Sequence, residues 1–316
     1  MDRRQFMTLV GGVAVAPFAA QAQQRVPRMG ILLVSGPDFM GPFQQELRNL
    51  GYVEGKNIQI EVRSAQGKAD RLPELAAELV RSKVDVIVAS VTPAVTAAKN
   101  ATREIPIIMA PAGDPIGTGL IVSLARPGGN ITGLSGTSAE LSAKCLELIR
   151  EIVPAARRVA VVGNASDPFS KPFLEEIQKG APTVRLEIQP LMVRGNDELD
   201  GAFAAMVRER ADAVIVQGNI PIQSSVDLAL KNRLPLLSSN KFVTQAGGLA
   251  SYSASLTERA RAVAGYVDKI LKGAKPAELP VQQPTTFDLT INLKTAKALG
   301  LTISPTLLNR ADEVIE

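Results

Sequence analysis

The sequence predicts an α/β protein made of two doubly wound parallel-sheet lobes. Short apolar runs alternate with segments of helical period, which is the pattern of repeated βαβ units. The order of these elements occurs twice along the chain, so two similar lobes are expected. A length of 316 residues is enough for two domains that each bury a core.

Residues 1–22 have the pattern of an export signal rather than of either lobe. Arg3 and Arg4 give a positive start, residues 6–20 are apolar and small, and Ala20-Gln21-Ala22 fits a signal-peptidase site. The apolar stretch is shorter than the ~20 residues that span a bilayer. The paired arginines also resemble a twin-arginine signal, and the choice between that route and the general secretory route stays open. We expect cleavage near Ala22 and a mature chain in the periplasm.

The first lobe is predicted to begin at residue 23. Residues 29–34 form an apolar run typical of a buried parallel strand, whereas residues 58–62 alternate as in a strand near a sheet edge. From Asp70 onward, apolar residues at helical spacing form one face of a helix. Strands are expected at 29–34, 58–62, 84–89, 107–110 and 131–135, and helices at 42–50, 70–80 and 92–102.

The second half of the chain repeats this order. Val80-Arg81 and Asp85 align with Val207-Arg208 and Asp212 at one common offset. Because several elements repeat together, two similarly folded lobes explain the pattern better than chance. Strands are expected at 159–162, 184–188, 213–217, 234–238, 249–252 and 286–291, and helices from 167, at 197–210, at 224–231 and from 257 to 272, followed by a short helix and a Pro-containing tail.

The chain is expected to cross between the lobes more than once, because its last elements do not make a third domain. The candidate hinges are residues 137–140, 252–256 and 275–280. The predicted division is residues 1–22 as the leader, 23–136 with 254–278 as the first lobe, and 137–253 with 279–316 as the second lobe.

The composition excludes several kinds of chemistry. Without histidine there is no His general base, no His-containing triad and no imidazole metal ligand. The single Cys145 excludes an intramolecular disulfide and a cysteine cluster for a metal. Its helical spacing with Leu141 and Leu148 predicts a buried, inert thiol.

No enzyme or nucleotide motif is present either. The chain has no P-loop and no GxGxxG after a strand, and residues 133–137 miss the nucleophile elbow at their last position. The net charge of +4 is small and the two signs are interspersed, which argues against a nucleic-acid partner. We therefore expect no catalytic residue, no metal and no cofactor.

A ligand is expected beyond the carboxyl ends of the strands, where two such lobes would face each other. Residues 90–93, Ser-Val-Thr-Pro, place hydroxyl and free N–H groups at a helix start, which suits a carboxylate; a plain helix cap is the alternative. Asp114 is either a counter-charge for an ammonium group or another cap. Phe39, Phe169, Phe242 and Tyr252 would pack on an apolar ligand or belong to the core. The repeat pairs residues 35–36 with 164–165, 90–92 with 217–219, and 111–114 with 238–241.

Several long segments carry a resemblance to known proteins. They are LRNLGYVEGKNIQIEVRSAQGKADRLPELAAELV, VDVIVASVTPA, AGDPIGTGLIVSLARPGGNITGLS, KFVTQAGGLASY, YVDKILKGAKPAELPVQQPTTFDLTINLKTAKALGL and LLNRADEVIE. Together they resemble the family of ABC-transporter substrate-binding proteins that includes tryptophan- and tyrosine-binding members. The resemblance covers essentially the whole mature chain, and the leader MDRRQFMTLVGG is similar to the leaders of such proteins.

The resemblance implies a type 1 periplasmic-binding fold with three crossovers. Such a protein closes on a small solute and docks on an ABC permease in the inner membrane; we expect a monomer. The solute is expected to be an aromatic or branched amino acid or a small carboxylic acid. The hinge motif falls at 249–252. The implied ligand contacts are Ser35, Ser90, Val91, Thr92, Gly113, Asp114, Asn164, Gly218, Asn219 and Asn240.

Two positions depart from the family pattern. Relatives often have Trp-Asn-Pro where this chain has Gly163-Asn164-Ala165, and often have Asp where it has Asn219. Without that second carboxylate, Asp114 is the main candidate for holding a ligand ammonium group.

Two other functions stay open on the sequence. A sensory protein that presents its solute to a membrane receptor would have the same fold, and its neighbouring genes would distinguish it. An enzyme that uses paired carboxylates on this scaffold is the other alternative, and the lack of histidine and the setting of Cys145 argue against it.

Overall fold

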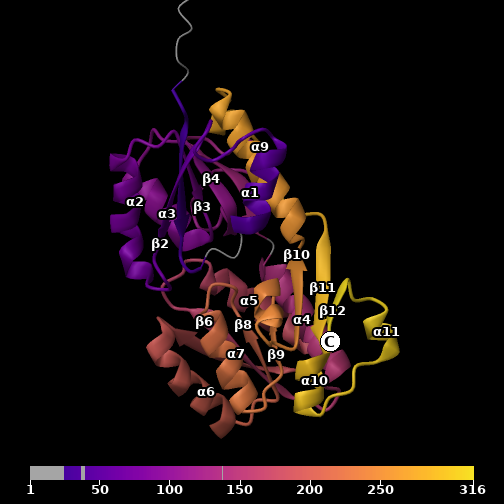
Figure 1. Ribbon diagram of the computed structural model, residues 1–316. Helices are drawn as coiled ribbons and strands as arrows, with labels where there is room; N and C mark the ends of the chain where they lie inside the picture. The colour runs from indigo at the N-terminus through magenta and orange to yellow at the C-terminus, as the bar shows by residue number, and fades with distance from the viewer. Residues whose placement is uncertain (1–24, 37–39, 137) are drawn as a thin grey trace, which may run out of the picture.

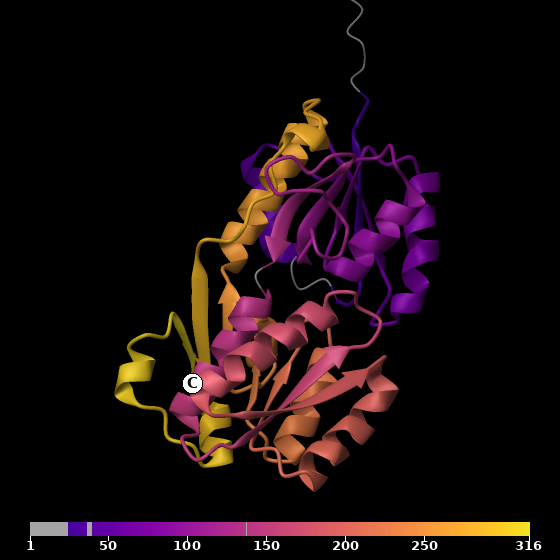
Figure 2. The same cartoon turned by 180° about the vertical axis from the view of Figure 1, so that it is seen from behind.

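The computed structural model describes residues 25–36, 40–136 and 138–316, so the predicted leader lies outside the described residues. The chain forms two lobes, each a sheet with helices on both faces (Figures 1 and 2). This confirms the prediction of two doubly wound α/β lobes. Within the described ranges, no helix has the length and apolar character needed to cross a membrane.

The first lobe is built mainly from the N-terminal part of the chain. Its elements are β1 (Arg28–Leu33), α1 (Met40–Asn49), β2 (Gln59–Ser64), η1 (Ala69–Arg71), α2 (Leu72–Arg81), β3 (Val86–Ala89), α3 (Thr92–Ala101), β4 (Ile107–Gly113), β5 (Ile131–Gly136) and, from much later in the chain, α9 (Leu256–Leu271) with η4 (Pro276–Glu278). The sheet order is β2-β1-β3-β4-β5, and all neighbours are parallel. Helices α2 and α3 pack on one face, and α1 and α9 on the other.

The second lobe contains the larger sheet. Its elements are α4 (Ser138–Ile152), β6 (Arg158–Asn164), α5 (Ser170–Gly180), η2 (Ala181–Val184), β7 (Glu187–Val193), η3 (Asn196–Glu198), α6 (Leu199–Arg208), β8 (Ala213–Val216), α7 (Ile222–Lys231), β9 (Leu236–Ser238), α8 (Lys241–Gln245), β10 (Ala250–Ala254), β11 (Phe287–Asn292), α10 (Leu293–Leu299), α11 (Pro305–Leu308) and β12 (Glu313–Ile315). The order is β12-β11-β10-β9-β8-β6-β7, and only β10 and β11 pair antiparallel. Helices α4 and α5 cover one face, and α6 and α7 the other.

The internal repeat is visible in the strand order. The order β2-β1-β3-β4-β5 of the first lobe corresponds to β7-β6-β8-β9-β10 of the second. The aligned residues Asp85 and Asp212 also have the same role. Asp85 Oδ2 accepts the backbone N–H of Arg28 at 2.7 Å, and Asp212 Oδ2 accepts that of Arg158 at 2.9 Å. Each carboxylate therefore ties the start of the third strand of its lobe to the start of the first.

The structure differs from the sequence-based elements at three places. The strand expected at 184–188 is β7, which begins at Glu187; as an edge strand it accommodates Pro190, whose missing N–H would disrupt a central strand. The Pro-containing tail adds the short strand β12. Residues 279–282 pack on the first lobe, because Val281 is buried there and Gln282 exchanges backbone hydrogen bonds with Gly133 and Ser135.

Strands β10 and β11 form the longer part of the connection between the lobes. They pair antiparallel over five residues each, and the rings of Tyr252 and Phe287 stack with centroids 5.9 Å apart. In the third crossover, the chain leaves the first lobe after residue 282 and continues into β11. The division of the chain at 136, 253 and 278 stays a prediction, and the packing of α9 on the first sheet supports its main feature.

Candidate functional site

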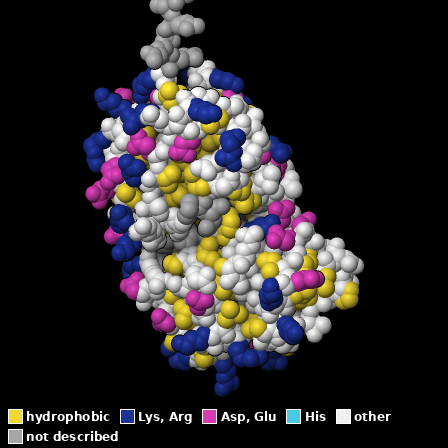
Figure 3. All heavy atoms as spheres, in the orientation of Figure 1, with side chains coloured by type: hydrophobic (Ala, Val, Ile, Leu, Met, Phe, Trp, Pro, Cys, Tyr) yellow, Lys and Arg dark blue, Asp and Glu magenta, His cyan; other side chains and the backbone are white. Residues whose placement is uncertain are grey.

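A cleft lies between the two lobes at the carboxyl ends of their parallel strands. It encloses about 1080 Å³, counting space that is open to solvent. Figure 3 shows the molecule hollowed at this level, with Lys, Arg, Asp and Glu side chains spread over both lobes rather than gathered on one. The lining residues are Leu33, Val34, Ser35, Gly36, Ser90, Val91, Thr92, Pro111, Gly113, Asp167, Phe169, Phe173, Gln217, Gly218, Asn219, Ile220, Ile222, Ser239, Asn240, Phe242 and Arg259. The cleft therefore has polar strand ends from both lobes and apolar walls.

Eight of the ten predicted ligand residues line this cleft. They are Ser35, Ser90, Val91, Thr92, Gly113, Gly218, Asn219 and Asn240. The structure brings these loops together because corresponding strands of the two repeats end at the same gap. Their contact with a ligand stays a prediction.

Asp114 and Asn164 are outside the lining, and both stabilise local turns. Asp114 Oδ1 accepts the N–H of Gly117 at 2.9 Å, and its carbonyl accepts the Thr118 hydroxyl. Asn164 is buried, and its Oδ1 accepts the N–H of Ser166 at 2.9 Å. For Asp114 this geometry favours the capping alternative over an ammonium clamp.

In the first-lobe wall, the loop at residues 90–92 is held by hydrogen bonds between its hydroxyl groups and the backbone of β4. Ser90 Oγ donates to the Ala110 carbonyl at 3.1 Å, and Thr92 Oγ1 accepts the N–H of Gly113 at 3.1 Å. Between them, Val91 has a φ of 64°, a strained conformation for a β-branched residue. In the described part of the chain, no acceptor takes the N–H of Thr92 or Ala94 at the start of α3. The loop therefore presents N–H groups, rather than free hydroxyl donors, to the cleft.

The second-lobe wall contains a buried carboxylate. Asp167 Oδ2 accepts from Gln217 Nε2 at 2.8 Å and from Asn219 Nδ2 at 2.7 Å, and Oδ1 accepts the N–H of Phe169 at 2.9 Å. Burial raises the pKa of Asp167 from 3.8 to about 6, against the lowering effect of these three donors. Because Asn219 turns its Nδ2 to Asp167, its Oδ1 faces away, and this buried oxygen has no partner in the described residues. It is an acceptor that no described residue uses.

Aromatic rings of the second lobe form the apolar wall. Phe169 and Phe173 lie with centroids 6.3 Å apart, and Phe242 lines the same cleft. Phe169 also reaches the first lobe, since a Cβ built on Gly113 would lie 2.5 Å from its ring. The two lobes therefore touch at this point, and the contact requires a glycine at position 113.

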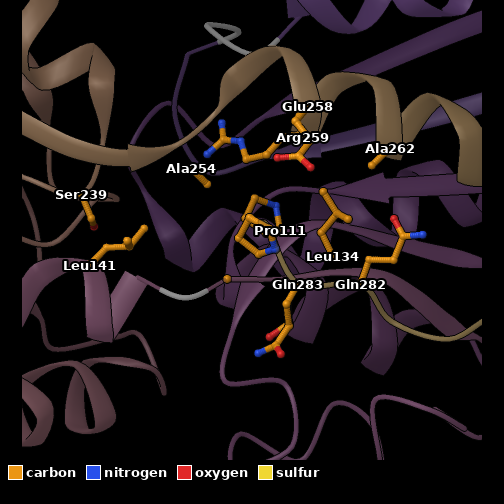
Figure 4. A pocket seen from close by; sticks show the side chains of 13 residues that line it. Pro111, Leu134, Leu141, Ser239, Ala254, Glu258, Arg259, Ala262, Gln282 and Gln283 are labelled. Carbon is orange, nitrogen blue, oxygen red and sulfur yellow. The ribbon is translucent and has the colours of Figure 1, made fainter. Parts of the chain in front are cut away.

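A second cavity of about 510 Å³, again counting open space, adjoins the cleft at the crossovers. It shares Pro111, Ser239 and Arg259 with the cleft. Figure 4 shows Arg259 and Glu258 on the helix that borders it, with Pro111 and Leu134 facing them. Arg259 is the fourth residue of α9, and its side chain lines both the cleft and this cavity.

Sequence reasoning missed Asp167 and Arg259 as cleft residues. Asp167 precedes a proline, so it was expected only at the start of a helix, and its partners lie about fifty positions later. Arg259 lies in an ordinary charged helix start, and only the return of α9 to the first lobe brings it to the cleft. The repeat predicted that Gln217 would lie at the cleft, and Gln217 does line it.

The single thiol of the chain lies in the core of the second lobe. Cys145 is fully buried, as predicted, and burial raises the pKa of its thiol to about 12. Across the described ranges, no group of three or more Cys, Asp and Glu side chains could hold a metal ion. Two α/β lobes around a partly apolar cleft with polar strand ends define a two-lobed solute-binding protein.

Comparisons with known proteins agree with this class. Residues 34–315 match the family described as ABC transporter substrate binding protein. A tyrosine-binding protein of Clostridioides difficile is 31% identical over 264 residues, which cover 82% of this chain and 75% of that protein. The chain therefore belongs to the ABC transporter substrate-binding protein family and is a binding component rather than an enzyme.

Solved structures extend the likeness to the whole fold. The ABC domain of Streptococcus pneumoniae in complex with L-Trp has 28% identity and a TM-score of 0.83, and the match covers 92% of this chain and 99% of that one. A conserved domain protein of Vibrio cholerae has 27% identity and a TM-score of 0.84, with 92% and 100% covered. These likenesses confirm the type 1 periplasmic-binding architecture. A leucine-binding protein of Thermotoga maritima shares the fold at 14% identity and a TM-score of 0.55, and the match covers 80% of this chain and 78% of that one.

Proposed function

We propose that this substrate-binding protein closes its two lobes on an α-amino acid with an aromatic or branched apolar side chain and presents it to an ABC permease. The observation that carries the proposal is the composition of the cleft. Phenylalanine rings and Ile220 and Ile222 form an apolar wall, while polar strand ends of both lobes lie beside it. An amino acid has this same division between an apolar body and a charged head.

The relatives support this choice of solute. One is named a tyrosine-binding protein, and another was solved in complex with L-Trp. An aromatic side chain would pack against Phe169 and Phe242, where ring–ring contacts add to the burial of apolar area. Closure follows because the ligand contacts both lobes and therefore stabilises the closed arrangement over the open one.

Thermal unfolding against a panel of amino acids tests the proposal. The midpoint should rise with L-tryptophan, L-tyrosine or L-leucine, because a ligand that binds only the folded protein stabilises it by mass action. L-aspartate and L-lysine are matched controls, since their side chains would place a charge on the apolar wall. A rise with the charged amino acids alone would contradict the proposed solute class.

We also propose that the protein is exported and that its leader is removed near Ala22. The positive start, apolar stretch and small residues of 1–22 support this. N-terminal sequencing of protein from the periplasmic fraction should begin near Gln23. Replacing Arg3 and Arg4 by lysine should block export by the twin-arginine route and leave the general secretory route intact. Full-length protein confined to the cytoplasm would contradict export.

A further inference from the structure

Arg259 has no carboxylate partner among the residues that the structure describes. Its Nε is buried and has no acceptor among the described residues, and none of the ion pairs found there includes it. Arg28, Arg63 and Arg158 each pair with a glutamate instead. A guanidinium nitrogen that loses water without gaining an acceptor is unfavourable, so the buried Nε of Arg259 carries a cost although the residue as a whole is only partly buried.

The position of Arg259 on its helix adds to this cost. It is the fourth residue of the 16-residue helix α9, where the N–H groups of the first turn already carry partial positive charge. The neighbouring Glu258 forms no ion pair with Arg259 in the described residues; its carboxylate accepts from Thr285 Oγ1 at 2.9 Å and from the N–H of Thr286 at 3.1 Å. Burial lowers the pKa of Arg259 to about 10, so the side chain is still charged at neutral pH.

The surroundings of Arg259 in the cleft favour an anion there. It lines the same cleft as Thr92, where the start of α3 leaves the N–H groups of Thr92 and Ala94 without an acceptor in the described chain. A helix start and a guanidinium both favour a carboxylate, and the guanidinium can bind one with two hydrogen bonds. Across the cleft, Asn219 Oδ1 is a buried acceptor without a partner.

We propose that Arg259 binds the carboxylate of the amino acid in the cleft and that Asn219 accepts a hydrogen bond from its ammonium group. This inference rests on the proposed function and names the residues that recognise the charged head. Because Arg259 also borders the hinge cavity, the bound carboxylate lies beside the crossovers about which the lobes move. Ligand binding then relieves an unfavourable charge at the hinge.

Calorimetric titration tests the proposal. The proteins are the wild type, Arg259→Met and Arg259→Lys, and the two ligands are L-tryptophan and tryptamine. Tryptamine keeps the ring and the ammonium group but lacks the carboxylate. Arg259→Met should weaken L-tryptophan binding by about 10- to 100-fold and leave tryptamine binding unchanged. Arg259→Lys should lose less, because it keeps the charge but not the two-pronged geometry. Arg261→Met is the matched control, since Arg261 is exposed on the same helix and should not affect either ligand.

The stability of the ligand-free protein gives a second measurement. Removing a charged group whose Nε is buried without an acceptor should raise the unfolding midpoint of Arg259→Met by about 2 °C, whereas loss of a structural residue would lower it. The proposal is overturned if Arg259→Met binds L-tryptophan like the wild type, loses both ligands equally, or unfolds earlier. If the wild type binds none of L-tryptophan, L-tyrosine and L-leucine, the proposed function fails, and this inference fails with it.

Discussion

The two lobes support their sheets in the same way and line the cleft in different ways. In each, an aspartate before the third strand accepts a backbone N–H from the first strand, at Asp85 and at Asp212. At the cleft the likeness ends. The first lobe fixes its loop with neutral hydroxyls bonded to backbone groups, whereas the second buries the carboxylate of Asp167 under two amide side chains.

This difference shows which parts of a repeated unit are free to diverge. The aspartates that join the strands make the same kind of backbone hydrogen bond in both lobes. The loops beyond the strand ends carry the binding chemistry and can differ without disturbing the sheet. The cleft consequently offers N–H groups and Arg259 on one side and oxygen acceptors on the other.

Removing the buried carboxylate should cost far more than removing the corresponding hydroxyl. Asp167→Ala leaves the amides of Gln217 and Asn219 without their acceptor, and we expect the free energy of unfolding to fall by about 4 kcal/mol. Thr92→Val in the first lobe should cost about 1 kcal/mol, because it removes a neutral hydrogen bond with Gly113 rather than a buried carboxylate. Urea unfolding of both variants measures the difference, and equal losses would contradict the contrast.

The buried carboxylate of the second-lobe cleft wall should also give a pH dependence that the hydroxyl groups of the first-lobe wall cannot give. The pKa of Asp167 is raised from 3.8 to about 6, so between these values the unfolded chain ionises while the folded protein keeps its proton. The contribution of Asp167 to the free energy of unfolding should therefore fall as the pH rises, by about 2 kcal/mol between pH 4 and pH 7. The comparison is the unfolding free energy of the wild type with that of Asp167→Asn across this range. A constant difference between the two proteins would show that Asp167 does not titrate in this way.

The contact between the lobes should depend on Gly113 and not on Gly218. A Cβ at Gly113 would lie 2.5 Å from Phe169 of the other lobe, whereas one at Gly218 would lie 3.5 Å from Asn240 of its own lobe. Gly113→Ala should thus weaken L-tryptophan binding by about tenfold, with little change in unfolding, because only the closed arrangement is strained. Calorimetric titration compares the variants with Gly201→Ala as the control, since Gly201 in α6 lies outside the cleft lining and an added Cβ there meets no atom within 4 Å. Full affinity in Gly113→Ala would mean that the bound form does not need this contact.

The two supporting aspartates should differ by a small amount. Asp212 Oδ2 accepts the N–H of both Arg157 and Arg158, whereas Asp85 Oδ2 accepts that of Arg28. Asp212→Ala should cost about 2 kcal/mol and Asp85→Ala about 1 kcal/mol, since each lost bond leaves a backbone donor unpaired near the surface. Chemical unfolding of the two variants ranks them. The reverse order would show that the repeat does not keep the same role at both positions.

The sequence predicted the parts of the structure that depend on local pattern. Apolar runs located the buried strands, and the repeat predicted which loops would meet at the cleft. Other features depended on residues distant in sequence. Asp167 has a locally ordinary Asp-Pro pattern, and its burial is produced by Gln217 and Asn219. Arg259 reaches the cleft only because α9 returns to the first lobe.

The boundaries of β7 show a different limit. Alternation predicted a strand at 184–188, but the chain forms a short 3-10 turn up to Val184, and Arg185 adopts a φ of 54° before the strand begins. A turn closed by backbone hydrogen bonds leaves no periodic signal in the side chains. The same holds for β12, whose three residues are too few to show a period.

The late position of α9 in the chain has a consequence for the order of synthesis. This helix supplies Ala260, Val263, Ala264, Tyr266 and Val267 to the apolar cluster that covers one face of the first sheet. A ribosome makes the strands of that sheet more than a hundred residues earlier, by Gly136. One apolar face of the nascent first lobe, which α1 covers in part, therefore stays partly exposed until α9 has been made. The second lobe is completed later still, when β11 and β12 join its sheet. Neither lobe is complete until almost the whole polypeptide has been made, so a chaperone that binds exposed apolar sheets has a long interval in which to act.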